Sequence, residues 1–325
     1  MKKIALAGHI CLDLIPKVRP DIQVAPGRLI EIGPLTMKIG GCVGNTARTL
    51  SALGTSFSTF AMVGDDILGD VVRREIDELG GESEGIIAVE GGSTSYSVIV
   101  DPPAGDRTIW HHVGVSDHFD GTSVRLDGVE LLHVGYPVLI PKIVEDGGAP
   151  LAQLLRRAKD DGITTSMDLA VVDRDAPAGQ LDWELILSRA CAHTDVISPS
   201  FDDVTSALGL NDDYSPARAR ELAELLLSWG AGVVALSAGE HGMTVRSAGA
   251  DRIVVAGLNP SWANLDVVIE PKGKAGGGTT NGAGDTSTAG LLYGIADGRS
   301  ALAALDLAAT CAAALVEGRP LPRQR

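Results

Sequence analysis

The sequence predicts an α/β fold, a three-layer, doubly wound and mostly parallel sheet that carries a small β-lid. Short apolar runs of strand length alternate with amphipathic helical patterns, which is typical of βαβ units and a parallel sheet. The chain has 40 glycines and only 4% aromatic residues, a balance that favours many tight strand-to-helix turns over an aromatic-rich β-sandwich. Two extended stretches, about 14–39 and 94–115, interrupt the alternation and predict the lid. We expect residues 1–325 to form one α/β domain.

The expected strands and helices follow one another along the chain. Strands are expected at Ile4–Ala7, Ser58–Val63, Val129–Val134, Thr164–Leu169, Asp195–Ser198, Val233–Ser237 and Met243–Arg246. Helices are expected at Asn45–Leu53, Asp66–Leu79, Ala149–Asp160 and Pro216–Trp229. The lid stretches contain β-rich runs at Tyr96–Val100 and Arg107–Trp110. Because α/β sheets bind ligands beyond the carboxyl ends of their strands, a lid at that end would cover a ligand.

Composition excludes several classes of protein. With 27 basic and 42 acidic residues the net charge is −15, which disfavours nucleic acid and anionic membranes as partners. The four cysteines contain no C-x-x-C pair, so neither a disulfide scaffold nor a structural zinc site is indicated, and we expect a reducing, cytoplasmic location. Asp13 interrupts the first apolar run, which therefore predicts a buried strand, and no run reaches the length of a membrane span.

The strongest local motif runs from Thr279 to Thr286 and leads into a helical pattern. Gly282, Ala283 and Gly284 would leave backbone N–H groups at a helix N-terminus, where they suit a phosphate or a developing anion. Asp285 would lie in the first turn, where a carboxylate can accept a proton from a bound hydroxyl. The alternative is that Asn281 and Asp285 only cap the helix.

Two further glycine clusters are candidate binding loops. Gly40 and Gly41 would let a ligand approach the backbone, and Asn45 could hydrogen-bond a polyol hydroxyl. Asp13, placed just past the first strand, could accept hydrogen bonds from two neighbouring hydroxyls, although an exposed loop carboxylate is equally compatible with the pattern. The third cluster, Ser237 to Gly242, joins two expected strands as a turn.

A serine hydrolase is the rival interpretation of that third cluster. Ser237 lies in a degenerate nucleophile elbow, but an elbow needs a helix after the serine and a histidine later in the chain, and the last histidine is His241. The sequence also lacks the P-loop, the dinucleotide-binding fingerprint and H-E-x-x-H. His111, His112 and His118 are close enough in sequence to suggest a metal site, but on a polar excursion solvent or substrate contact is favoured.

Taken together and in this order, the motifs resemble the ribokinase-like (PfkB-type) carbohydrate kinase family from about residue 4 to residue 316. Gly40-Gly41 with Asn45 is similar to the N-terminal signature of the family. Gly64-Asp65-Asp66 with Gly69 is similar to its G-D-D-x-x-G turn, and Asn281 to Asp285 is similar to its C-terminal signature.

The resemblance implies a set of roles. Asp285 would be the catalytic base, and Gly282, Ala283 and Gly284 would form the anion hole. Asp13, Gly40, Gly41 and Asn45 would bind the sugar, while Ser237, Gly239, Gly242 and Asn281 would bind ATP, with Mg²⁺ bridging the phosphates. The implied reaction is in-line phosphoryl transfer under a lid that excludes water.

Three positions bear on how fully the family pattern applies. Where the family has Asn-x-x-Glu, this chain has Ser200 and Asp203; Asp203 is a candidate metal ligand, but Ser200 cannot replace the amide. Thr279 stands where the family often has Asp, which leaves the need for a monovalent cation open. Asp168 matches a common family Asp at the end of its strand.

We therefore expect an ATP-dependent kinase that phosphorylates a hydroxyl of a sugar or similar polyol. A nucleoside kinase is the nearest alternative, because Tyr96, Trp110 and the adjacent histidines could stack a base. A catalytically weak sugar- or nucleotide-binding regulator is the second alternative, motivated by Ser200 and Thr279. The resemblance also makes a homodimer joined through the lid strands plausible.

Overall fold

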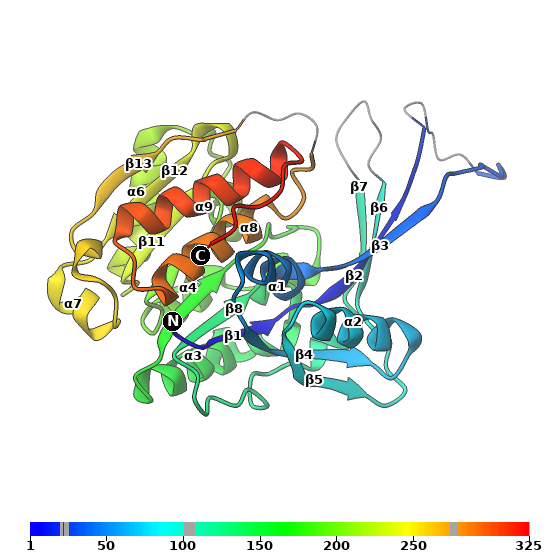
Figure 1. The fold of residues 1–325 in the computed structure, drawn as a ribbon, viewed down its shortest axis with the longest axis horizontal. Coiled ribbons are helices and arrows are strands. Elements are labelled where there is room, and N and C mark those ends of the chain that lie inside the picture. Colours follow the sequence, from blue (N-terminus) through cyan, green and yellow to red (C-terminus); the bar gives the residue numbers. More distant parts are fainter. Residues whose placement is uncertain (20–21, 23–25, 101–107, 274–277, 325) are drawn as a thin grey trace.

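The computed structural model describes residues 1–19, 22, 26–100, 108–273 and 278–324, and these form two sheets (Figure 1). The larger sheet has nine strands. In spatial order they are β13 (Asp266–Ile269), β12 (Met243–Ser247), β11 (Val233–Ser237), β10 (Val196–Ile197), β9 (Thr164–Asp168), β8 (Leu131–Gly135), β1 (Ile4–Gly8), β4 (Phe57–Gly64) and β5 (Glu82–Val89). Neighbours from β5 to β11 are parallel, whereas β12 and β13 are antiparallel. The predicted mostly parallel sheet is confirmed.

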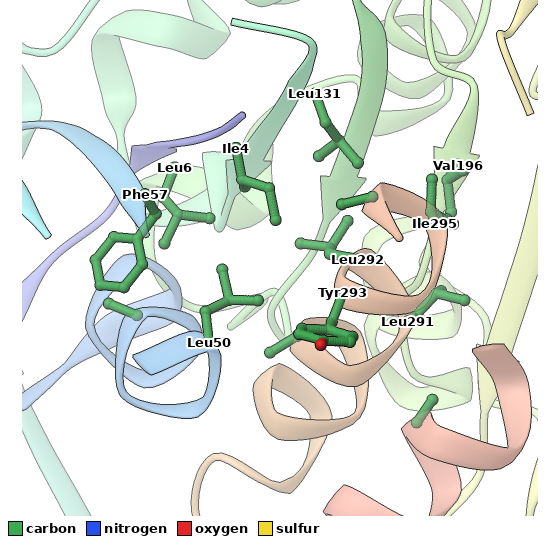
Figure 2. Close-up of a cluster of buried hydrophobic side chains, with 14 of the residues drawn as sticks. Ile4, Leu6, Leu50, Phe57, Leu131, Val196, Leu291, Leu292, Tyr293 and Ile295 are labelled. Atoms are coloured by element: carbon green, nitrogen blue, oxygen red, sulfur yellow. The ribbon is translucent and has the colours of Figure 1, made fainter. Parts of the chain in front are cut away.

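Alternating side chains of the strands face two separate cores, because successive residues of a strand point to opposite faces. On β1, Ile4 and Leu6 lie in one core, while Ala5 and Ala7 lie in the other. Helices α1 (Gly41–Leu53), α2 (Ile67–Glu78), α7 (Ala250–Val255), α8 (Ala283–Ala296) and α9 (Ala301–Val316) cover the first core. Helices α3 (Glu145–Asp160), α4 (Trp183–Cys191), α5 (Phe201–Ala207) and α6 (Pro216–Ser228) cover the second. Figure 2 shows Leu50 of α1 and Leu292 of α8 pointing toward the strands of the first core, so the three predicted layers are present.

The smaller sheet projects from the main body in Figure 1 and is called the lid sheet here. Its strands, in spatial order, are β3 (Leu35–Gly40), β2 (Cys11–Pro16), β6 (Tyr96–Val100) and β7 (Thr108–His112). They come from the two predicted excursions, of which residues 20–21, 23–25 and 101–107 lie outside the described part. The expected β-run at Tyr96–Val100 is confirmed, and the expected run ending at Trp110 continues to His112.

Two other expectations need correction. Asp13 does not lie in a loop past the first strand but within β2, because the chain passes directly from β1 into the lid sheet. The helix expected from Asn45 begins four residues earlier at Gly41, so the glycine cluster forms its first turn instead of a preceding loop.

Several elements were not expected from the sequence. They are β2, β3, β5, β13, α4, α5, α7 and α9, whereas the helix expected after the Thr279–Thr286 motif is present as α8. The expected helix Ala149–Asp160 is the regular part of α3, whose earlier residues Asp146 to Gly148 have non-helical backbone angles.

One buried ion-pair cluster supports the main sheet. Asp195, fully buried, accepts hydrogen bonds from Lys159 at 2.8 Å and from the backbone N–H of Thr165 at 2.9 Å, and it pairs with Arg252 of α7. The cluster therefore ties α3 and α7 to the start of β10. In the described part of the chain, no helix has the length and apolar character needed to cross a membrane.

Candidate active site

The candidate site forms where the first turns of α1 and α8 meet. Asp285 lies in the first turn of α8 and is fully buried. Its Oδ2 accepts hydrogen bonds from the Asn45 amide at 2.9 Å and from the Tyr136 hydroxyl at 2.9 Å. Its Oδ1 has no hydrogen-bond partner among the described residues. One carboxylate oxygen is thus held in place while the other is available to a ligand.

The chemistry of Asp285 is set by its surroundings. Burial raises the pKa of this carboxyl to about 7, and the nearby Asp203 acts in the same direction, whereas the hydrogen bonds from Asn45 and Tyr136 lower it. A pKa near neutrality suits a group that accepts a proton during a reaction.

The chain enters α8 through a conformation that only glycine adopts at little cost. Gly282 precedes the helix with φ 79°, and a Cβ there would lie 3.1 Å from Cγ of Asn45. The first N–H groups of α8 are therefore presented beside the Asn45–Asp285 contact. The motif predicted as an anion hole has the backbone geometry of a helix N-terminus, and Ala283 and Gly284 are part of its first turn.

Tyr136 is a site residue that the sequence did not reveal. It follows β8 and has left-handed backbone angles, φ 55° and ψ 53°, which are unusual for a bulky residue. Its N–H donates to the carbonyl of Asp168 on the neighbouring strand at 3.3 Å. Strained residues often cluster at functional sites, but nothing in the local sequence Gly-Tyr-Pro marks a contact with a residue 149 positions away.

Further buried carboxylates lie close to Asp285. Ligand atoms of Cys42, Asp168 and Asp285 all lie within 4.8 Å of one another. Burial raises the pKa of Asp168 well above its usual range, and the charges of Asp285 and Asp203 raise it further. The Thr288 hydroxyl of α8 donates to Asp168 at 3.2 Å. The strand end carrying Asp168 therefore faces the start of α8.

Asp203 lies near this group and also caps a helix. Its N–H donates to the Ser200 hydroxyl at 3.0 Å, and its carboxylate accepts from the Ser200 N–H at 2.7 Å, which together form a capping box at the start of α5. Burial raises the pKa of Asp203 to about 6. One carboxylate oxygen of Asp203, the candidate metal ligand, thus accepts a hydrogen bond from the backbone.

The predicted sugar-binding residues lie together on the lid side of α1. Asp13 is 4% exposed, and burial raises its pKa, while the nearby Lys38 lowers it. A Cβ on Gly40 would lie 2.4 Å from Oδ1 of Asp13, so only glycine allows the carboxylate to pack over the start of α1. Gly41 begins that helix, and Asn45 follows one turn later. The structure thus brings together Asp13, Gly40, Gly41, Asn45 and Asp285.

The predicted nucleotide-binding residues are distributed over two places. Ser237 ends β11 and donates its N–H to the carbonyl of Pro199, while Gly239 and Gly242 form the turn into β12. Asn281 lies just before α8, where its N–H donates to the Thr279 hydroxyl. The turn after β11 is adjacent to β10 and Ser200, because Ser200 and Ser237 form a parallel bridge.

Comparisons with known proteins identify the family of the chain. A family profile described as pfkB family carbohydrate kinase matches residues 1–319. The chain is 24% identical over 171 residues to the ATP-dependent ribose-1-phosphate kinase of Halopiger xanaduensis, a match covering 52% of this chain and 54% of that protein. It is 24% identical to the bifunctional protein HldE of Desulfatibacillum aliphaticivorans, over 97% of this chain and 59% of that protein. The chain thus spans between half and three fifths of the length of these two curated relatives.

Solved structures share the fold. Ribokinase of Arabidopsis thaliana, complexed with ribose and ATP, superimposes with a TM-score of 0.75 at 17% identity, covering 97% of this chain and 93% of that one. A nucleoside kinase of Burkholderia thailandensis in complex with inosine gives 0.69 at 19% identity, covering 98% and 94%. The fold is therefore ribokinase-like, and the profile match over nearly the whole length shows that the chain belongs to the pfkB family of carbohydrate kinases.

Proposed function

We propose that the protein transfers the γ-phosphoryl group of ATP to a hydroxyl group of a sugar or polyol, with Asp285 as the base. The observation that carries the proposal is the state of this carboxylate: fully buried, held through Oδ2 by Asn45 and Tyr136, and unpartnered at Oδ1. A fixed carboxylate with one available oxygen suits a general base.

The reaction follows from this geometry. The proton of the substrate hydroxyl passes to Oδ1 of Asp285 as the hydroxyl oxygen attacks the γ-phosphorus, and the bond to ADP breaks. The N–H groups of Gly282, Ala283 and Gly284 would stabilise the negative charge on the transferred group, because the positive end of the α8 dipole lies there. Base and anion hole thus belong to one helical turn, which fixes their relative position.

The buried carboxylates fit magnesium. Oxygen donors suit this ion, and the charges of Asp203 and Asp285 raise the pKa of Asp168, a repulsion that a divalent cation would relieve. Asp168 would hold the ion together with Asp203, whose capping oxygen leaves its other oxygen for a metal or a bound water. Bound magnesium would neutralise charge on the phosphate oxygens. The departure at Ser200 is consistent with a helix cap, since its hydroxyl accepts the Asp203 N–H.

The nucleotide would lie along the turn after β11. Ser237, Gly239 and Gly242 follow a parallel strand, and the next strand turns back antiparallel, so this turn lies at the carboxyl edge of the sheet, where α/β proteins bind ligands. Asn281 would contact the nucleotide from the start of α8. The ribokinase of Arabidopsis thaliana, whose structure contains ATP, has the same fold and supports this choice of donor.

A nucleoside acceptor is the second candidate, supported by the similarity to the nucleoside kinase complexed with inosine. The largest side chain offered for base stacking, Trp110, does not favour it. Trp110 is 51% exposed, and by strand register it faces away from Asp13 and Ser97. We therefore favour a sugar or polyol. The intact contacts of Asp285 also disfavour a regulator without catalytic activity.

We also propose that two copies associate through the outer face of the lid sheet. The register places Met37, Leu14, Val98 and Trp110 in one row across the four strands. Met37 is 49% exposed, Trp110 is 51% exposed, and Leu35, two residues before Met37 on the same face, is 54% exposed. Exposed apolar side chains on a projecting sheet favour burial against a second copy.

The test of the proposed function is transfer of labelled phosphate from ATP to sugars, polyols and nucleosides. We expect a labelled product from one class and a loss of about 100-fold or more in kcat for Asp285→Asn, which keeps the shape of the side chain but removes the base. Asp297→Asn, at the far end of the same helix, is the control and should retain activity. Equal turnover by Asp285→Asn and the natural protein would refute the role of Asp285.

A further inference from the structure

The inner face of the lid sheet carries a row of polar side chains. Strand register aligns Lys38 with Asp13, Asp13 with Ser97, and Ser97 with His111. Residues paired in this way share a face of the sheet, so the row crosses all four strands. Because Asp13 packs over Gly40 at the start of α1, this is the face turned toward the candidate site. We call these four residues the inner row.

A second histidine meets this row from the main body. His9 lies between β1 and β2, and its ring packs edge-on against His111 with 5.0 Å between centroids. Its N–H donates to the Gly135 carbonyl at 3.2 Å, and its carbonyl accepts from Val43 at 3.1 Å. Gly135 directly precedes Tyr136, and Val43 directly follows Cys42. These two hydrogen bonds therefore fix His9 beside the site.

The rings of the two histidines have unused hydrogen-bonding capacity. His9 is 1% exposed, and neither of its ring nitrogens has a partner among the described residues. His111 pairs through Nδ1 with the Ser97 hydroxyl at 3.1 Å, but its buried Nε2 also lacks a described partner. Buried polar atoms without partners are costly, and at a ligand site they indicate groups that a ligand supplies.

The protonation state of the rings decides which ligand fits. Burial lowers the pKa of His9 to about 3 and also lowers that of His111, so both rings are neutral near pH 7. A neutral imidazole offers one donor and one acceptor. A hydroxyl group can satisfy both, whereas an ionised phosphate or carboxylate only accepts hydrogen bonds.

The charges around the inner row also disfavour an anion. Asp13 lies within the row, where the Cys11 thiol donates to its Oδ1 at 3.6 Å and Lys38 is its cross-strand neighbour. Arg48 approaches from α1, but its charge is shared among Asp13, Glu75 and Asp285, each of which raises its pKa while burial lowers it. The cations near the row, Lys38 and Arg48, already face the carboxylate of Asp13, so a second anion on the substrate would compete with this carboxylate for them and would otherwise meet neutral rings.

We propose that the His9–His111 pair, with Asp13 and Ser97, selects an uncharged, hydroxyl-rich part of the substrate, so that the acceptor is a neutral sugar or cyclic polyol and not a sugar phosphate or sugar acid. The inference rests on the proposed function and deepens it by naming the substrate class. It also separates this chain from the ribose-1-phosphate kinase to which it is 24% identical.

The experiment compares matched ligand pairs. Affinities are measured by calorimetry without ATP for ribose and ribose 1-phosphate, fructose and fructose 6-phosphate, and inositol and inositol 1-phosphate. Phosphoryl transfer to the same compounds is then measured with ATP and magnesium. His111→Phe keeps the ring against His9 and removes both nitrogens. His112→Phe, next on β7 and on the opposite face, is the matched control.

We expect at least one neutral ligand to bind about tenfold or more tightly than its phosphate, because the phosphate adds an unpaired charge. His111→Phe should weaken that binding about tenfold, and His111→Gln, which keeps a donor and an acceptor, should recover part of it. His112→Phe should change it by no more than about twofold.

Three results would overturn the inference: tighter binding of the phosphates, equal effects of His111→Phe and His112→Phe, or no binding of any neutral compound. Its failure is distinguishable from failure of the proposed function. Efficient transfer to a sugar phosphate would leave the kinase proposal standing and remove the inference. If a neutral sugar binds in a way that depends on His111 but no phosphoryl group is transferred to it, the inference about binding would stand and the kinase proposal would fail.

Discussion

The hydrogen bond from Tyr136 to Asp285 predicts a measurable change in pH dependence. Tyr136→Phe removes the hydroxyl that donates to Oδ2 at 2.9 Å and keeps a bulky ring at the same backbone position. Only the ionised carboxylate accepts the substrate proton, and the hydrogen bond stabilises that ionised form. Its loss must therefore raise the pKa of Asp285. As the pH is lowered, the variant must then lose activity at a higher pH than the natural protein does.

The size of the change follows from the contact. A hydrogen bond to a charged group contributes about 1.5–3 kcal/mol, and one pH unit corresponds to about 1.4 kcal/mol. The pKa of about 7 should thus rise to about 8–9 in Tyr136→Phe. At pH 7 the ionised fraction would fall from about one half to between about 1% and 10%, which lowers kcat/KM about five- to fifty-fold.

The assay is kcat/KM measured from acidic to alkaline pH for the natural protein and the variant. We expect the acidic limb of the profile to move upward by about one to two pH units and the alkaline plateau to be retained. Tyr293→Phe, at the far end of α8, is the control and should leave the limb in place. A limb that does not move, or an equal loss at every pH, would refute the assignment of Tyr136 as a residue that positions and tunes the base.

Three further substitutions test the site, the fold and the assembly. Gly40→Ala places a Cβ against the Asp13 carboxylate and should raise KM for the acceptor at least about tenfold, measured by steady-state kinetics. Asp195→Asn leaves the charges of Arg252 and Lys159 without their anion and should lower the free energy of unfolding by about 3 kcal/mol, measured by unfolding in urea. Met37→Glu puts a charge on the outer lid face and should convert a dimer into a monomer, measured by light scattering.

For each of these three predictions a further measurement gives the result that would contradict it. Gly249→Ala places its new methyl group in ordinary van der Waals contact, 3.7 Å from Oδ1 of Asn264, so a KM change equal to that of Gly40→Ala would contradict the steric argument. Asp161→Asn, on the surface, should cost little, and an equal loss there would count against the buried cluster. A natural protein that is already monomeric at high concentration would end the dimer proposal.

The layered fold could be predicted because its signals are local. Buried parallel strands such as Val233–Ser237 are short continuous apolar runs, and the structure has this strand with the same bounds. The edge strand Glu82–Val89 was missed because only one side of it is paired, and its exposed Glu82 breaks the apolar run. The alanine-rich α9 was missed because a helix apolar on most sides lacks the periodicity that marks an amphipathic one.

The candidate site also contains residues that local motifs predict and residues that only the folded chain reveals. Asp285 and Asn45 were predicted because each lies within a glycine-containing motif, and the structure places them 2.9 Å apart. Tyr136 and His9 were not, because their importance depends on contacts made by the folded chain. A left-handed backbone at Tyr136 and unpartnered ring nitrogens at His9 become visible only in three dimensions.

The contact between Asn45 and Asp285 joins residues 240 positions apart, and it has a consequence for biosynthesis. The ribosome synthesises α1 long before α8, so the Asn45 amide has no Asp285 carboxylate to bond while most of the sheet is being made. The nascent chain can build β1, β4 and β8 early, yet it lacks the proposed base, Asp285, until α8 docks. Enzymatic turnover therefore reports on completed folding, and an incomplete chain that has already formed most of the sheet would consume no ATP by this mechanism.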